Sequence, residues 1–143
     1  MRFMILVKAT ADSEAGKMPP ESLFAEMGAY HEELAKAGVL LDGNGLRPTA
    51  AGFRIHYDGK QRRVVDGPFA ETKEIVAGYT MIQVRSREEA LEWARRFPNP
   101  SIDGGVAQIE VRQMFELDDF AAPGDSHALD RMRELDIGQA GKR

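Results

Sequence analysis

The run Phe3-Met4-Ile5-Leu6-Val7, at residues 3–7, contains no polar side chain. Successive side chains of a β-strand point to opposite faces of the sheet, so a strand of this composition is expected to be buried on both faces. A small domain covers one face of its sheet with its own helices, and the other face needs a different cover. A partner subunit is the simplest cover. The run therefore predicts an obligate homodimer with a largely apolar interface.

Hydrophobic periodicity places the other elements around this strand. Apolar residues at helical spacing predict a first helix that follows Pro19-Pro20 and ends at Gly38, and a Ser86-Arg87-Glu88-Glu89 capping box opens a second helix. A short strand over 39–41, a hairpin around Asp58-Gly59, and longer strands over 78–84 and 106–115 complete the order. This order predicts an α+β fold, the ferredoxin-like βαββαβ arrangement with an extra hairpin, with both helices on one sheet face.

The length predicts one domain with an appendage. Of the 143 residues, 1–116 are expected to form the domain, and 117–143 a C-terminal extension. This extension contains a short amphipathic pattern, with Leu129, Met132 and Leu135 at helical spacing.

Composition excludes several classes of function. The chain has 19 Lys and Arg against 23 Asp and Glu, a net charge of -4, which argues against a broad nucleic-acid surface. It has no cysteine, which removes disulfide scaffolds, thiolate zinc sites and cysteine nucleophiles. It also lacks a run of about 18 apolar residues and a secretory signal, so we expect a soluble cytoplasmic protein from a prokaryote.

Five segments resemble a known family when they are taken together. They are Leu41-Asp42-Gly43-Asn44-Gly45-Leu46-Arg47-Pro48, Asp66-Gly67-Pro68-Phe69-Ala70-Glu71-Thr72-Lys73-Glu74, Gly78-Tyr79, Glu89-Ala90-Leu91-Glu92-Trp93-Ala94 and Ile109-Glu110-Val111-Arg112. With them the chain resembles the DGPF branch of the YCII-related proteins over residues 2–115. The resemblance implies a dimeric α+β barrel, in which two ferredoxin-like sheets pack face to face with their helices outside.

The resemblance implies less about chemistry. Most relatives have no assigned activity. Some YCII-related proteins are thought to use a His-Asp pair in a pocket, and one relative eliminates chloride from a chlorinated hydroxyquinone. DGPF relatives often accompany extracytoplasmic-function sigma factors, which implies a regulatory setting.

His31 is the first candidate catalytic residue. It lies four residues after Met27 and three before Leu34, on the apolar stripe of the first predicted helix, in the region where YCII-related proteins place their histidine. Partial burial favours the neutral imidazole, which can act as a base near pH 7. The alternative interpretation is a core histidine that is hydrogen-bonded to a backbone carbonyl.

Asp66 is the second candidate. It begins the predicted turn Asp66-Gly67-Pro68-Phe69, and a carboxylate there can orient His31 or take a substrate proton. Its alternative role is to accept hydrogen bonds from turn amides. Phe69 and Tyr79 are predicted to form the apolar wall of the pocket. Glu71 and Lys73, in a charged segment, either bind a polar ligand at the cleft mouth or form a solvated surface.

Arg112 and Glu110 share one face of the last predicted strand. They are expected either to point into the barrel and hold an anion, or to form an exposed pair of little energetic value. No metal site is predicted, since the spacing around His56 supports no further ligand. No cofactor is predicted either.

Together these features predict a small, cofactor-free, dimeric pocket protein. The leading hypothesis is a lyase- or isomerase-type proton transfer on a small organic molecule, with His31 and Asp66 moving the proton. The alternative is a non-catalytic ligand-binding or regulatory module associated with a sigma factor, and a third possibility is a purely structural dimer. The sequence does not name the substrate.

Overall fold

A computed structural model of the chain describes residues 1–120 and 127–138. The strands are β1 (Arg2–Lys8), β2 (Leu40–Gly45), β3 (Phe53–Asp58), β4 (Gln61–Asp66), β5 (Val76–Gln83) and β6 (Ile109–Gln113). The α-helices are α1 (Ala11–Glu14), α2 (Glu21–Lys36), α3 (Arg87–Arg95) and α4 (His127–Glu134), and three short 3-10 helices are η1 (Thr49–Ala51), η2 (Thr72–Glu74) and η3 (Leu117–Phe120).

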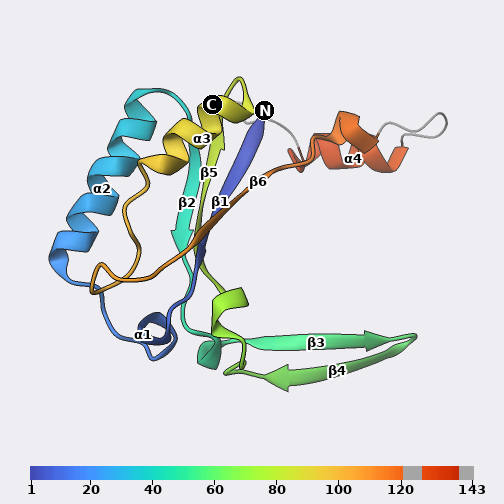
Figure 1. Ribbon diagram of the computed structural model, residues 1–143. Helices are drawn as coiled ribbons and strands as arrows, with labels where there is room; N and C mark the ends of the chain where they lie inside the picture. The colour runs from blue at the N-terminus through green and yellow to red at the C-terminus, as the bar shows by residue number, and fades with distance from the viewer. Residues whose placement is uncertain (121–126, 139–143) are drawn as a thin grey trace.

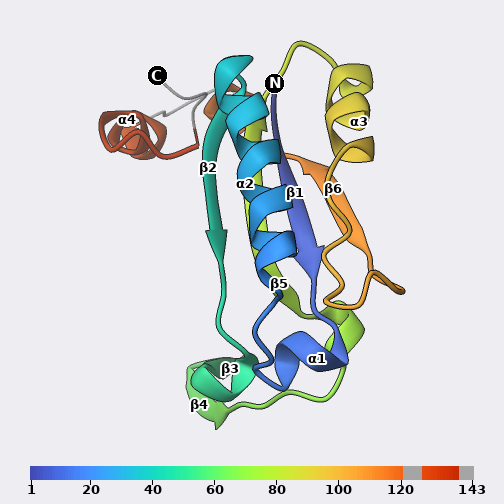
Figure 2. The same cartoon turned by 90° about the vertical axis from the view of Figure 1, so that its left-hand side faces the viewer.

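The main sheet has the strand order β2-β5-β1-β6, and every neighbouring pair is antiparallel. Helices α2 and α3 both cover the same face of this sheet (Figures 1 and 2). The predicted ferredoxin-like βαββαβ fold is therefore confirmed. The predicted extra hairpin is also present, as β3 and β4, which form a separate two-stranded sheet.

The core lies between the covered face and the two helices. Phe3 and Ile5 of β1 pack with Tyr30 and Leu34 of α2 and with Trp93 of α3. Leu34 and Ile5 are completely buried, and burying a side chain of this size stabilises a fold by about 1.5–3 kcal/mol. The Tyr30 hydroxyl donates to the carbonyl oxygen of Trp93 at 2.8 Å and so joins α2 to α3.

The other face of β1 is only partly covered by the residues that the structure describes. Met4 and Leu6, which alternate with Phe3 and Ile5, are only partly buried. They lie beside Met81 and Tyr79 of β5. Burial on both faces of β1 is thus not reached within one chain, and the cover that the sequence predicts for this face, a second copy, stays a prediction.

The hairpin of residues 53–66, which we call the arm, projects away from the main sheet on the side opposite α2 and α3 (Figure 1). Gly59 has a φ of 61°, the left-handed conformation that a tight turn between two strands requires. The cross-strand partners Ile55 and Val64 share one face of the arm with Phe53 and Tyr57. All four side chains are exposed, by 42% at Ile55 and by 63–64% at the others.

The turn from Asp66 to Phe69 fastens the base of the arm to η1. The Gly67 N–H donates to the Gly52 carbonyl at 3.0 Å, and the peptide bond between Gly67 and Pro68 is cis. The Phe69 N–H donates to the Thr49 hydroxyl at 3.1 Å. That hydroxyl in turn donates to Glu14, so the turn, η1 and α1 form one connected unit.

Several element ends differ from the prediction. The last strand is shorter than 106–115, and the second strand extends to Gly45 rather than ending at residue 41. The capping residue Ser86 accepts from the Glu89 N–H at 3.1 Å, but the Glu89 carboxylate accepts from Arg85 rather than from Ser86. None of the helices in residues 1–120 and 127–138 is both long and apolar enough to span a membrane.

Candidate functional site

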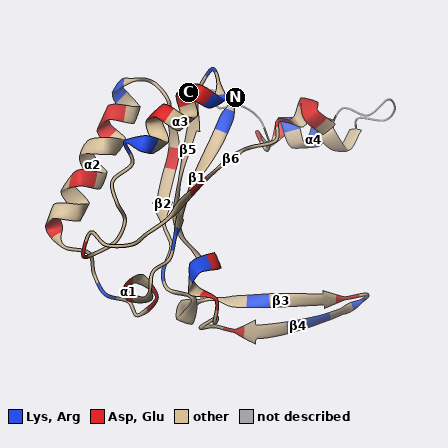
Figure 3. Cartoon of the chain, in the orientation of Figure 1, with Lys and Arg blue, Asp and Glu red and all other residues tan. Residues whose placement is uncertain are grey.

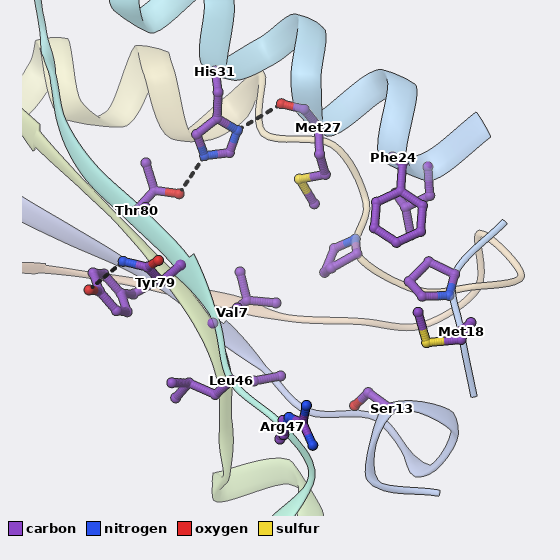
Figure 4. A pocket seen from close by; sticks show the side chains of 18 of the residues that line it. Val7, Ser13, Met18, Phe24, Met27, His31, Leu46, Arg47, Tyr79 and Thr80 are labelled. Atoms are coloured by element: carbon purple, nitrogen blue, oxygen red, sulfur yellow. Dashed lines mark hydrogen bonds between the residues drawn. The ribbon is translucent and has the colours of Figure 1, made fainter. Parts of the chain in front are cut away.

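A cleft of about 940 Å³ opens beside α2 on the helix-covered side of the sheet. Its walls come from the first half of α2, the segment before it, the end of β2 and the middle of β5 (Figure 4). Most of the lining side chains are apolar, and they include Val7, Met18, Leu23, Phe24, Met27, Leu46 and Phe97. A cavity of this size, mainly apolar with a few polar groups, has the usual character of a small-molecule site.

His31 is the central polar side chain of this cleft. Its Nδ1 lies 2.7 Å from the Met27 carbonyl oxygen, and its Nε2 lies 2.8 Å from the Thr80 hydroxyl (Figure 4). A carbonyl oxygen can only accept, so Nδ1 carries a proton and donates it. In the neutral ring Nε2 then accepts from the Thr80 hydroxyl, and the tautomer is fixed by the backbone of its own helix.

The surroundings of His31 hold the ring in place and leave room beside Nε2. Tyr30 and Phe97 meet the ring edge to face, with centroids 5.6 and 6.3 Å away. On the strand side, Gly43 presents only backbone, and a Cβ at that position would sit 3.4 Å from Nε2. The glycine therefore keeps the side of the imidazole nearest β2 free of side-chain atoms.

Two cations line the cleft, and Figure 4 places Arg47 at the end opposite His31. Lys17 is paired with Asp12 at 3.0 Å. Arg47 lies near Leu46 and Ser13 in Figure 4 and forms no ion pair with any residue that the structure describes. A ligand that fills the cleft would thus meet His31 and Thr80 at one end and a positive charge at the other.

The structure brings His31 into a cleft but does not bring Asp66 to it. Both ring nitrogens of His31 bond to other groups. Asp66 is exposed at the end of β4, is not among the residues that line the cleft, and accepts no side-chain hydrogen bond from the described residues. His31 is hydrogen-bonded to a backbone carbonyl, that of Met27, as the alternative interpretation expects, and its ring also lines the cleft.

The two residues predicted to form the apolar wall, Phe69 and Tyr79, lie in different places in the structure. Phe69 lies outside the cleft, with the Arg54 guanidinium stacked 3.7 Å from its ring centroid. Tyr79 is among the residues that line the cleft, but the register places its side chain beside Leu6 on the open face of the sheet. There its hydroxyl donates to Asp42 at 3.0 Å and accepts from Asn44 at 3.0 Å. These hydrogen bonds hold the Asp42-Gly43-Asn44 segment against β5 as part of strand β2.

The predicted charged residues lie elsewhere. Glu71 and Lys73 are exposed at η2 and do not line the cleft. Arg112 is exposed on β6, with its Nε 3.9 Å from Glu110, on the sheet face that the helices leave open. Its place on that face agrees with the predicted register.

Thr80, whose hydroxyl bonds to His31, is not among the site residues predicted from the sequence. The available signal was a hydroxyl residue at a helix-facing position of an otherwise apolar strand. Thr80 is 2% exposed, and a buried hydroxyl needs a hydrogen-bond partner. Among the described residues, no group of three or more His, Cys, Asp or Glu side chains is placed to hold a metal ion.

Comparisons with known proteins support the family and not the chemistry. An uncharacterised protein of Rhizobium meliloti (strain 1021) is 30% identical over 100 residues, which cover 70% of this chain and 81% of that protein. The structure of 5-chloro-2-hydroxyhydroquinone dehydrochlorinase from Burkholderia phenoliruptrix AC1100, in complex with 2,5-dihydroxybenzoquinone, has a TM-score of 0.45 and 15% identity, covering 81% of this chain and 95% of that one. A likeness this weak transfers neither activity nor ligand.

The family prediction is tested most directly by a sequence model of the YCII-related domain, which matches residues 1–115. The matched segment includes all four strands of the main sheet and the two helices that cover it. The predicted DGPF branch within the family stays a prediction. The chain belongs to the YCII-related domain family.

Proposed function

We propose that the cleft beside α2 binds a small, mainly apolar organic molecule. The observation that carries this proposal is the His31 imidazole, held in one tautomer at the wall of an apolar cleft of about 940 Å³. The apolar side chains bury the body of the ligand, and the Thr80 hydroxyl and His31 contact one polar group on it. Arg47 favours a ligand with a negative or electron-rich group at its other end.

A proton-transfer activity of the lyase or isomerase type is the finer proposal. Nε2 of His31 is the basic nitrogen, because Nδ1 is committed to the Met27 carbonyl. Nε2 is hydrogen-bonded to the Thr80 hydroxyl and both residues line the cleft, so the hydroxyl acts as a relay. It gives its proton to Nε2 while its oxygen takes one from the substrate. The Met27 carbonyl, and not Asp66, then stabilises the imidazolium.

Exchange of carbon-bound hydrogen in D₂O tests the activity without a known substrate. Small ketones, phenols and hydroxyquinones are incubated with the protein, and the loss of C–H signals is followed by ¹H NMR. We expect at least one compound to exchange in wild type and to lose at least tenfold of its rate in His31→Gln. Asp66→Asn is the matched control, and we expect its rate to stay within twofold of wild type.

A non-catalytic ligand-binding or regulatory role is the second candidate. The observation that favours it is that both imidazole nitrogens are already hydrogen-bonded, and that neither bonds to a carboxylate of the residues that the structure describes. This role predicts binding in the cleft with no exchange above the buffer rate. A sigma factor as the regulated partner is an expectation from the resemblance alone. A pull-down with any sigma factor encoded in neighbouring genes tests that link.

We also propose that the protein is a homodimer through the open face of the sheet. Met4, Leu6 and Met81 form an apolar strip there, on the face opposite the one that α2 and α3 cover. Light scattering should give about twice 15.9 kDa at low micromolar concentration. A mass of one chain at every concentration would contradict the dimer.

A further inference from the structure

The arm has a mainly apolar face that the described chain leaves largely uncovered. Arg62 shares this face and lies over the Tyr57 ring, 4.9 Å from its centroid. Phe53, Tyr57 and Val64 are 63–64% exposed and Ile55 42%, and register places all four on the same face. An isolated two-stranded hairpin is marginally stable in water, and four large apolar side chains gathered on one such face mark an interaction surface. The arm therefore needs a second surface to pack against.

The length and direction of the arm indicate where that surface lies. β3 has six residues, so the arm extends for about 20 Å at 3.3 Å per residue. It points away from the sheet on the side of the open face (Figure 1). Two sheets that pack face to face lie about 10 Å apart. An arm of this length would cross that spacing and continue along the flank of a second copy.

The charges of the arm and of α2 also favour a second copy of the chain as the partner of the arm. The arm carries Arg54, Lys60, Arg62 and Arg63 against two acidic residues, Asp58 and Asp66. The exposed surface of α2 carries Glu21, Glu26, Glu32 and Glu33 against Lys36. Figure 3 shows this separation, with blue on the strands of the arm and mostly red on α2. In a face-to-face pair, a basic arm that reaches past the partner's sheet arrives at the level of its acidic helix layer.

Surface area supports a second copy as well. The four apolar side chains expose roughly 400 Å² in the single chain, taking about 150–200 Å² for each fully exposed side chain. A stable interface buries about 800 Å² per partner. The arm supplies about half of this area, and it projects on the side of the open face, which carries the apolar strip of Met4, Leu6 and Met81.

We propose that each arm packs its apolar face against the other protomer of the homodimer. This inference rests on the proposed homodimer and adds to it a specific contact, the face of Phe53, Ile55, Tyr57 and Val64. The arm is then a clasp that crosses the interface. Its opposite face, with His56 and Arg63, stays in solvent.

Single cysteines test the contact, because the native chain has none. Val64→Cys places a thiol on the apolar face, and Arg63→Cys, the neighbouring residue of the same strand, places one on the opposite face. Both positions are exposed in the single chain. The rate of reaction with a chromogenic disulfide reagent is measured over a dilution series, and light scattering records the mass of each sample.

We expect the thiol at position 64 to react at least tenfold more slowly than the thiol at position 63 while the protein is dimeric, and the two rates to converge on dilution. A Val64→Cys protein that is monomeric where Arg63→Cys is dimeric would also support the contact. Equal rates in a dimer would overturn the clasp and leave the dimer standing. Slow reaction at position 64 in a monomer, at every concentration, would show that the chain covers its own arm, and it would overturn both.

Discussion

Replacing Gly67 by alanine should damage the fold more than any other alanine substitution near the arm. The N–H of Gly67 donates to the Gly52 carbonyl, which holds this residue against η1. A Cβ on Gly67 would lie 1.8 Å from the carbonyl oxygen of Thr49 and 2.6 Å from its carbonyl carbon. Because these are backbone atoms, no side-chain rotation relieves the contact, and η1 has to shift by roughly 1 Å or more.

The cost follows from what is displaced. Overpacking costs about 1–3 kcal/mol, and here the displaced segment also holds Phe69 and Glu14 through Thr49. We therefore expect about 3 kcal/mol of lost stability. Gly52→Ala is the matched control, because its Cβ would meet the same Thr49 oxygen at an ordinary 3.7 Å. That substitution should change stability by less than about 0.5 kcal/mol.

Urea unfolding, followed by the fluorescence of the single tryptophan, measures both variants at one protein concentration. Trp93 lies in the core and reports loss of the packed state. With a slope of about 1.5 kcal/mol per molar, a loss of about 3 kcal/mol lowers the urea midpoint by about 2 M. A Gly67→Ala midpoint within about 0.3 M of the Gly52→Ala midpoint would refute the packing argument.

Three further predictions concern other parts of the fold. Burial raises the pKa of Tyr30 from 10.0 to about 12, so the contribution of the protonated Tyr30 to folding stability is complete below pH 10 and falls by about 1 kcal/mol between pH 10 and pH 11. The difference in unfolding free energy between wild type and Tyr30→Phe should shrink by that amount over this pH range, and a constant difference would contradict the prediction. Thr49→Val leaves the N–H of Phe69 without its acceptor and should cost about 1–3 kcal/mol in urea unfolding, whereas an unchanged midpoint would deny its role in the arm's base. Ser86→Ala removes the cap on the N–H of Glu89 and should cost about 1 kcal/mol, with Ser86→Asp as the variant that restores stability.

Local patterns predicted the elements well where the structure depends on neighbours in sequence. The alternation of residues 53–57 and the Asp58-Gly59 turn predict the arm, because the register of such a hairpin is set by its turn. The strand predicted over 39–41 stops before Asp42-Gly43-Asn44-Gly45, because glycine, asparagine and aspartate are typical of turns. This segment is a strand because β5 pairs with it and Tyr79 binds Asp42 and Asn44, and neither contact is visible locally.

The site was less predictable, because it depends on distances between segments. The apolar stripe of α2 correctly placed His31 toward the sheet, where it lines the cleft. The stripe does not reveal that Thr80, 49 residues later, takes Nε2. The predicted pairing of Asp66 with His31 rested on the Asp66-Gly67-Pro68-Phe69 segment. In the structure this segment fixes the base of the arm, where Gly67 lies too close to η1 for any side chain.

The central claim is that the cleft beside His31 is the ligand site, and the methionine methyl groups test it directly. Met18 and Met27 line the cleft, while Met4 and Met81 lie on the open face of the sheet and serve as internal controls. The methyl carbons are labelled with ¹³C and the protein is titrated with small aromatic ketones, phenols and carboxylic acids. We predict that some compounds shift the Met18 and Met27 signals and leave Met4 and Met81 unchanged. Compounds that bind but move only Met4 and Met81, or a library that moves neither pair, would contradict the claim.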